Sequence, residues 1–184
     1  MAKPSQVIVL LEDNRQQQFI HRYLRRIGLK PHAIRFVLPS SGSGEQWVRE
    51  RFPTEAAAYR RRSLRAETKL IAVTDADNLS LPERLAQLDR GLAGAGLDPI
   101  RIDEQIARLI PRRNVETWIL YLNAVAVDEE IDYKRTRNDW VQLTRPAAER
   151  LYAWTRPNTR LPDVCIPSLQ HGIAELCRLD FSAA

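Results

Sequence analysis

The stretch that most constrains the fold is KLIAVTDADN, residues 69–78, in which a short apolar run stops at two aspartates one residue apart. The run is too short for a helix and too uniformly apolar for a strand with one face in water, which indicates a buried central strand of a parallel sheet. Open α/β sheets bind ligands just beyond the carboxyl ends of their strands. Asp75 and Asp77 are therefore candidate site residues, and an extended chain would point both carboxylates the same way.

The same aspartates have a simpler explanation, because acids after a strand also form turns and cap helices. Asp77 with Asn78 could open the loop to the next helix. Two converging carboxylates repel each other, however, and a divalent cation is a natural partner for them. A cation site requires further acids from other parts of the chain.

A second apolar run, residues 6–11, also ends in acids, Glu12 and Asp13. Apolar residues at helical spacing follow it up to Gly28, which is a plausible helix stop. The order strand, acid, helix opens a doubly wound fold. With further strands expected at 33–38 and 106–110, the sequence predicts an α/β fold with about four mostly parallel strands and helices on both faces.

Helical patterns fill the rest of the chain, at 45–64, at 81–92, from 115 onward, at 145–154 and at 167–179. Pro53 should break or kink the first of these, because proline lacks the amide hydrogen that the helix needs. Asn114 should cap the helix at 115, whose buried stripe is expected to reach Val125. We expect an α/β core at 1–127 and a helical extension at 128–184 that packs on it, in one compact domain.

The composition is that of a folded domain with excess positive charge: 44% of the residues are apolar, 28% are charged, and the net charge is +5. No apolar segment approaches membrane-spanning length, so we expect a soluble cytoplasmic protein without membrane contact. The basic residues are mostly arginine, which suits paired contacts to phosphate, although genomic base composition produces the same excess. The lysines are confined to Lys3, Lys30, Lys69 and Lys134.

Acids at three expected positions of the sheet edge make the prediction more specific. Glu12 follows the first strand, Asp75 and Asp77 follow the third, and Glu116 opens the helix after the fourth. The glutamate and the Asp-x-Asp resemble the Toprim superfamily, the catalytic domain of topoisomerases, bacterial primases, recombination mediators and OLD-type nucleases. ETWILYL, at 116–122, is similar to the Glu-x-Trp motif of small stand-alone Toprim-like proteins, which include defence-associated domains of unknown function. The resemblance covers roughly the first 125 residues.

The resemblance implies metal-assisted phosphoryl transfer by a hydrolase, most simply a nuclease that acts on nucleic-acid phosphodiesters, with a role in phage defence. Asp75 and Asp77 would hold Mg²⁺ or Mn²⁺, and Glu116 would complete the metal shell. Glu12 would be a further metal ligand or the general acid/base.

The resemblance also points to phosphate contacts and partners. Arg112 and Arg113 precede a helix N-terminus, itself an anion site, and could clamp phosphate oxygens there. Many relatives have a glycine and a lysine or serine after the first glutamate; here Asp13, Asn14 and Arg15 replace them, and Arg15 could supply the missing charge. DNA or another nucleic acid is the implied partner, with a companion ATPase or defence-system subunit and an oligomeric assembly as further options.

Two alternatives stay open. A non-catalytic Toprim-fold module would bind nucleic acid or a protein without cutting, and the departures after Glu12 keep this alternative open. A response-regulator receiver would share the acidic pair in LLEDN, but receivers need a lone aspartate after the third strand and a later lysine at a strand end. Here the third strand is followed by Asp-x-Asp, and no lysine occurs between Lys69 and Lys134.

Overall fold

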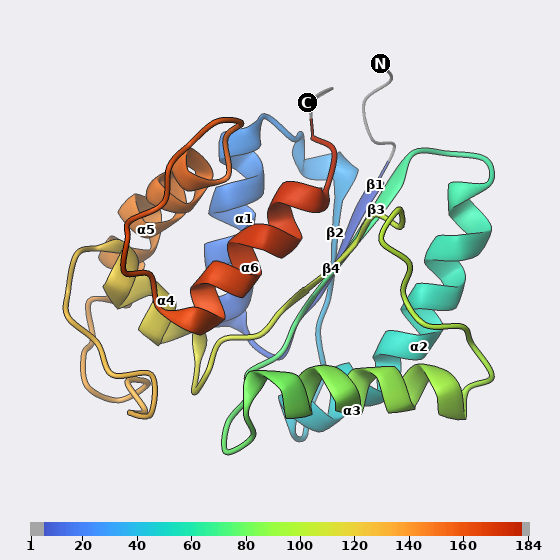
Figure 1. Ribbon diagram of the computed structural model, residues 1–184, viewed down its shortest axis with the longest axis horizontal. Helices are drawn as coiled ribbons and strands as arrows, with labels where there is room; N and C mark the ends of the chain where they lie inside the picture. Colours follow the sequence, from blue (N-terminus) through green and yellow to red (C-terminus); the bar gives the residue numbers. More distant parts are fainter. Residues whose placement is uncertain (1–5, 182–184) are drawn as a thin grey trace.

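The computed structural model describes residues 6–181 and has one parallel sheet covered by helices on both faces (Figure 1). The strands are β1 (Gln6–Leu10), β2 (Ile34–Val37), which follows the 3₁₀ turn η1 (Pro31–Ala33), β3 (Thr68–Val73) and β4 (Ile106–Leu109). Their order is β2-β1-β3-β4, and every neighbouring pair is parallel. The predicted α/β class is confirmed, and β3 is a buried central strand as expected.

The helices form two layers, one on each face of the sheet (Figure 1). One face carries α1 (Asn14–Ile27), α4 (Val115–Leu122), α5 (Trp140–Trp154) and α6 (Pro167–Arg178), and the other carries α2 (Gly44–Ser63) and α3 (Leu81–Gly94). Alternate side chains of a strand point to opposite faces, so Val7 and Val9 lie in the first core whereas Ile8 and Leu10 lie in the second.

The strand register sets the position of the acids. Leu10 of β1 pairs with Ala72 of β3, and both strands end within two residues of this pair. Residues just beyond the two strands, Glu12 and Thr74, therefore lie opposite each other at the carboxyl edge of the sheet. The acids thus lie at one edge of the sheet because β1 and β3 end at nearly the same level.

Helix α2 continues through Pro53, so the predicted break is wrong. Pro53 is buried and packs toward α3, where a β-carbon at Gly91 would lie 3.5 Å from the Pro53 ring. Burial of the helix face against β3 and α3 outweighs the missing backbone hydrogen bond, because tertiary packing supplies most of the stability of a protein helix.

Helix α4 is shorter than the sequence predicted, and Val125 is 38% exposed rather than buried. Asn123 donates side-chain hydrogen bonds to the carbonyls of Ile119 (2.7 Å) and Leu143 (2.9 Å), and Ala124 has a φ of 62°. These local contacts end the helix at Leu122, one turn before the apolar pattern does.

The C-terminal helices pack on the parallel core: α5 lies against α1 and α4, and α6 lies against β4. Trp118 of α4 donates to Ser168 of α6 (2.7 Å), and Gly172 leaves room for its ring. The boundary between 1–127 and 128–184 stays a prediction, and residues 1–5 and 182–184 lie outside the described residues. No helix within residues 6–181 is long and apolar enough to span a membrane.

Candidate functional site

Glu12 follows β1 and is held by the neighbouring strand end. Its Oε1 accepts hydrogen bonds from the Thr74 hydroxyl (2.5 Å) and the Asp75 amide (2.8 Å), and its own amide donates to Gln16 Oε1 (2.9 Å). Burial raises the pKa of Glu12 to about 7, and the charge of Asp77 adds to the rise. A carboxyl group with this pKa can give or accept a proton near neutral pH.

Asp75 is the most deeply buried acid of the edge, with 1% of its surface exposed. Its Oδ1 accepts from Gln16 Nε2 (3.0 Å), and its Oδ2 lies 3.3 Å from Lys134 Nζ. Burial, followed by the charge of Glu12, raises the pKa of Asp75 well above its ordinary value. Asp75 and Glu12 therefore share one small, poorly solvated volume in which two full negative charges are costly.

Asp77 does not lie parallel to Asp75, so the expectation of an extended chain is wrong here. Its φ of 53° is left-handed, and the chain turns at this residue. The Asp77 side chain is half exposed, with Arg84 Nη2 3.6 Å from its Oδ2. Its charge still raises the pKa of Asp75 and Glu12, which places it at the rim of the same cluster.

Glu116, in the first turn of α4, is 4% exposed and lies 3.4 Å from Arg15 Nε. Burial raises the pKa of Glu116, and the charge of Asp13 raises it further. Within the described residues, Glu116 Oε2 and Asn114 Oδ1 are buried without a hydrogen-bond partner. Asn114 occupies the N-cap position as predicted, but its side chain donates to Asp132 (2.7 Å) instead of capping the helix.

Lys134 is the basic residue beside the buried Asp75, and it was not predicted from the sequence as a site residue. Partial burial lowers the pKa of Lys134, but the charges of Asp75, Asp13 and Glu116 outweigh it and raise the pKa above its ordinary value. The lysine reaches the edge from the loop between α4 and α5, where Asp132 accepts a hydrogen bond from its amide (2.8 Å). A lone lysine after an acidic stretch was the available signal.

Arg112 and Arg113 tie down the turn that carries Asp77. Arg112 forms two hydrogen bonds with Glu130 (2.9 and 2.7 Å) and donates to the Asp77 carbonyl (3.3 Å). Arg113 donates to the same carbonyl (3.1 Å) and to the side chain of Asn78. Their predicted contact with phosphate stays a prediction, as does that of Arg15.

The start of α2 is fitted closely against Glu12. A β-carbon at Gly44 would lie 2.7 Å from both the Glu12 β-carbon and the Glu12 carbonyl oxygen. Gly42 has open space around it but a φ of +90°, which other residues rarely adopt. The SSGSG turn therefore needs glycine for two different reasons: a left-handed backbone at Gly42 and close packing against Glu12 at Gly44.

The donor atoms of the edge suit a hard cation. Electrostatic interactions link its acids, which are Glu12, Asp13, Asp75 and Glu116 with Asp77 at the rim. Arg15 contacts Glu116, and Lys134 contacts Asp75. Carboxylate and amide oxygens are ligands that Mg²⁺ and Mn²⁺ prefer, and within the described residues Asp75 Oδ2, Asn114 Oδ1 and Glu116 Oε2 are buried without a hydrogen-bond partner. Within residues 6–181, no three acidic, histidine or cysteine side chains are arranged as a ready-made metal site, so the metal stays a prediction.

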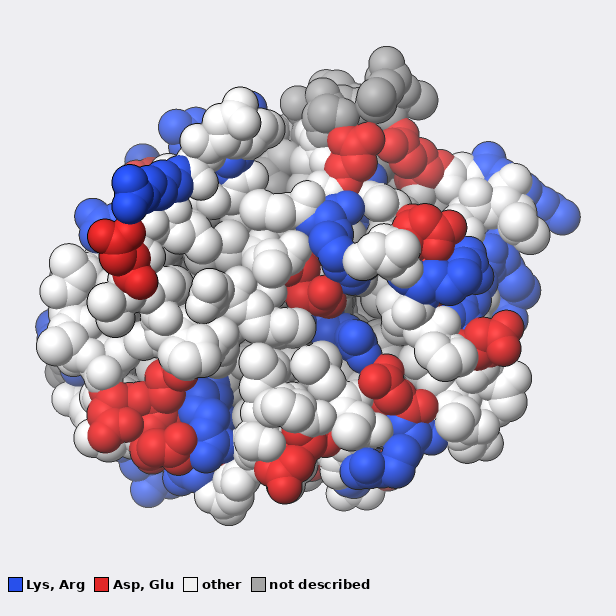
Figure 2. Space-filling model, viewed as in Figure 1, with Lys and Arg blue, Asp and Glu red and all other residues white. Residues whose placement is uncertain are grey.

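Charge is also mixed on the surface of the molecule. Figure 2 shows acidic and basic side chains interspersed over the face that carries α6, including acids beside basic residues over the loop between α4 and α5. The net positive charge is therefore not gathered on this face. The loop that delivers Lys134 is itself rich in acids, at residues 128–132.

The chain is similar to a tRNA dimethylallyltransferase from Ralstonia nicotianae, with 32% identity over 127 residues. The match covers 67% of this chain and 39% of that protein, so the chain spans about two fifths of the relative's length. No family model matches the chain, and no solved structure matches it. The Toprim resemblance therefore stays a prediction based on short motifs.

Proposed function

We propose that this protein is a divalent-metal-dependent phosphoryl-transfer enzyme, a nuclease that acts on nucleic-acid phosphodiesters. The observation that carries the proposal is the burial of Glu12, Asp75 and Glu116 at one sheet edge, where burial raises the pKa of each. Buried carboxylates with too few counter-charges destabilise a fold, and such clusters are concentrated at functional sites.

The proposed roles of the acids are those that the Toprim resemblance implies. Asp75, Asp77 and Glu116 would hold Mg²⁺ or Mn²⁺, which would neutralise a scissile phosphate and lower the pKa of a bound water. Glu12 would be a further ligand or the general acid/base. Both hydrogen bonds to Glu12 are made to Oε1, which leaves Oε2 to exchange a proton.

Positive charge for a phosphate group is available at the same edge. Lys134 reaches it from an exposed loop with 41% of its side chain accessible, and Arg15 is 27% accessible. Both could contact phosphate oxygens as the substrate enters. The partial relative is named for a reaction on tRNA, which supports a nucleic acid as the substrate class. A role in phage defence and a companion ATPase or second subunit are part of the proposal.

Metal binding is the first test. Mg²⁺ or Mn²⁺ at 100 times the dissociation constant should stabilise the protein by about 2.7 kcal/mol, because only the folded state brings the acids together. Asp75→Asn should abolish this rise in melting temperature, whereas Asp163→Asn, which makes the same charge change at an 83% exposed side chain, should retain it. An equal rise in wild type and Asp75→Asn would contradict the proposed site.

Cleavage is the second test. Labelled single- and double-stranded DNA and RNA should yield shorter products with Mn²⁺, and Glu12→Gln should lower the rate by at least about 100-fold, the usual contribution of a positioned acid or base. Binding that survives EDTA, with no product under any condition, would support the non-catalytic module instead.

The ion pair between Lys134 and Asp75 favours one other function, that of a phosphoacceptor domain, since receivers place a lysine beside their aspartate. The burial of Asp75 and its hydrogen bond from Gln16 count against it. Incubation with acetyl phosphate and Mg²⁺ separates the two functions by mass spectrometry. A phosphoryl adduct on wild type that is absent from Asp75→Asn would replace the nuclease proposal.

A further inference from the structure

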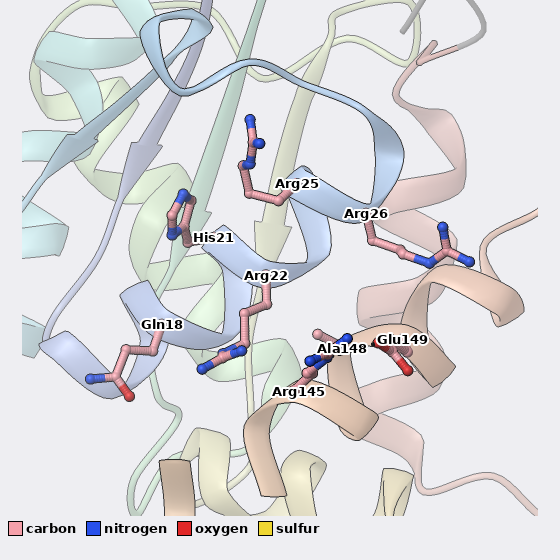
Figure 3. Close-up of a pocket in the computed structure, with 8 residues that line it drawn as sticks. All are labelled: Gln18, His21, Arg22, Arg25, Arg26, Arg145, Ala148 and Glu149. Atoms are coloured by element: carbon pink, nitrogen blue, oxygen red, sulfur yellow. Dashed lines mark hydrogen bonds and ion pairs between the residues drawn. The ribbon is translucent and has the colours of Figure 1, made fainter. Parts of the chain in front are cut away.

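The groove between α1 and α5 is a second charged feature, separate from the acidic edge. It has a volume of about 520 Å³ and is lined by Gln18, His21, Arg22, Arg25, Arg26, Arg145, Ala148 and Glu149 (Figure 3). Four of these residues are arginines, and Glu149 is the single acid. The small Ala148 of α5 is part of the lining, and the volume is typical of a ligand pocket.

Two of the arginines, Arg22 and Arg145, make no contact that would contribute much to the stability of the fold. Within the described residues, Arg22 of α1 has no hydrogen-bond or ion-pair partner. Arg145 of α5 pairs only with Glu149 one turn along its own helix (3.2 Å), and these side chains are 73% and 51% exposed. An exposed pair of this kind contributes little to stability. Two guanidinium groups thus line one groove from two helices, an arrangement that favours an anion.

The other basic residues of the groove do have local roles. Arg25 donates to the Leu29 carbonyl (2.7 Å), and Arg26 stacks over the Tyr152 ring at 5.0 Å. Both also lie in the last turn of α1, where the helix dipole favours cations. Burial, followed by the charges of Arg25 and Arg22, lowers the pKa of His21, as expected beside a net positive groove.

The groove is connected to the acidic edge by α1 itself. Arg15 lies at the start of the helix and contacts Glu116, and Arg22 lies two turns further along, on the same side of the helix. At 1.5 Å per residue, this separation is about 10 Å along the helix axis. A chain of phosphates that enters the groove could therefore continue to the edge.

We propose that this groove binds the sugar-phosphate backbone of a single nucleic-acid strand, with Arg22 and Arg145 as the main phosphate contacts. Its volume suits one strand rather than a duplex, and the planar guanidinium groups suit paired contacts to phosphate oxygens. The proposal rests on the proposed function only for the strand's onward path to the acidic edge. Binding in the groove needs no metal.

The test is fluorescence anisotropy with labelled 20-nucleotide DNA and RNA strands, in EDTA and over a range of salt concentrations. Arg22→Ala combined with Arg145→Ala should weaken binding about tenfold or more. It should also reduce the slope of log affinity against log salt by about 1.4, because each contact to a single strand contributes about 0.7. Unchanged affinity and slope would overturn the proposal. If the double variant fails to fold, Arg145→Ala alone, at an exposed position, should reduce the slope by about 0.7.

A charge-matched control variant distinguishes the loss of phosphate contacts in the groove from a general effect of lower net charge on strand binding. Arg61 and Arg65 line another hollow with no acid, at the start of β1 and β3, so Arg61→Ala combined with Arg65→Ala removes the same charge elsewhere. This control should change affinity less than about twofold, since it removes no proposed contact. An equal or larger loss in the control would overturn the groove as the site.

Two further binding measurements distinguish a single strand from a small phosphate ligand and from duplex DNA. Inorganic pyrophosphate that displaces the strand at an equal phosphate concentration would overturn the strand in favour of a small phosphate ligand. Duplex DNA that binds more tightly than the single strand would overturn it as well. In EDTA the wild-type protein should still bind the strand, so a failure to bind metal or to cleave leaves the groove proposal intact.

Discussion

The acidic edge and the α1/α5 groove both concentrate charge of one sign, but they hold it differently. At the edge, Glu12 and Asp75 are buried and fixed by hydrogen bonds from Thr74 and Gln16. In the groove, Arg22 and Arg145 are accessible and have few partners. The edge is therefore part of the folded core, and its charges act on stability. The groove lies on the surface of α1 and α5, and we expect that loss of the Arg22 and Arg145 charges leaves the fold intact.

The largest effect is expected at Glu12, as a loss of stability with rising pH. Burial raises the pKa of Glu12 from 4.5 to about 7 in the folded protein. Below pH 4.5 both states are protonated; between pH 4.5 and 7 only the unfolded state releases the proton, so the free energy of unfolding falls. At about 1.4 kcal/mol per pH unit, the loss from this residue is about 3 kcal/mol.

Urea unfolding in EDTA at several pH values measures this loss. Glu12→Gln keeps an acceptor oxygen for Thr74 and for the Asp75 amide, so it should fold and should show a flatter profile over the same range. A profile as steep as that of wild type would show that Glu12 is not the group responsible.

A smaller effect is expected at Lys134. Lys134→Met removes the counter-charge of buried Asp75 and should destabilise the protein by about 1 to 2 kcal/mol at pH 8, less than for a fully buried pair because the lysine is partly exposed. Lys30→Met, at an exposed position, is the matched control and should have no measurable effect. Combining Lys134→Met with Asp75→Asn should recover the loss; if it does not, the two residues are not coupled.

The smallest effect is expected in the groove. Arg22→Ala combined with Arg145→Ala should change the free energy of unfolding by less than about 0.5 kcal/mol, although it weakens strand binding. Arg60→Ala is the contrast, because Arg60 holds the buried Glu104 with two hydrogen bonds (2.7 and 3.0 Å), and it should cost about 1 to 3 kcal/mol. A large loss of stability in the Arg22/Arg145 double variant would show that the charges of the groove, like those of the acidic edge, contribute to folding.

The parts of the fold that were predictable are those set by local pattern. Short apolar runs located the four strands, and because the runs of β1 and β3 both end in acids, the parallel register then brought Glu12 and Asp75 to one edge. The left-handed turn at Asp77 could not be read in this way, because aspartate adopts either conformation and the contacts from Arg112 and Arg113 decide between them. The helix through Pro53 depends equally on packing that the sequence does not display.

Lys134 and the groove were missed for a related reason. Lys134 follows Asp75 by 59 positions and meets it only because the loop between α4 and α5 folds back over the edge. Arg22 and Arg145 become neighbours only when α5 packs on α1. The spacing of apolar residues along the chain predicts single helices and strands well, but it carries little information about which distant loop or helix packs against them.

Gly44 gives the SSGSG segment a practical consequence for engineering. A polar, glycine-rich stretch looks like a spacer in which a label or tag could be inserted, and near Gly42 the surroundings are open. At Gly44, two residues later, the same stretch cannot accept a side chain, because even a methyl group would clash with the main chain of Glu12. A saturation library at position 44 should return glycine almost exclusively, and any survivor should carry a displaced first turn of α2.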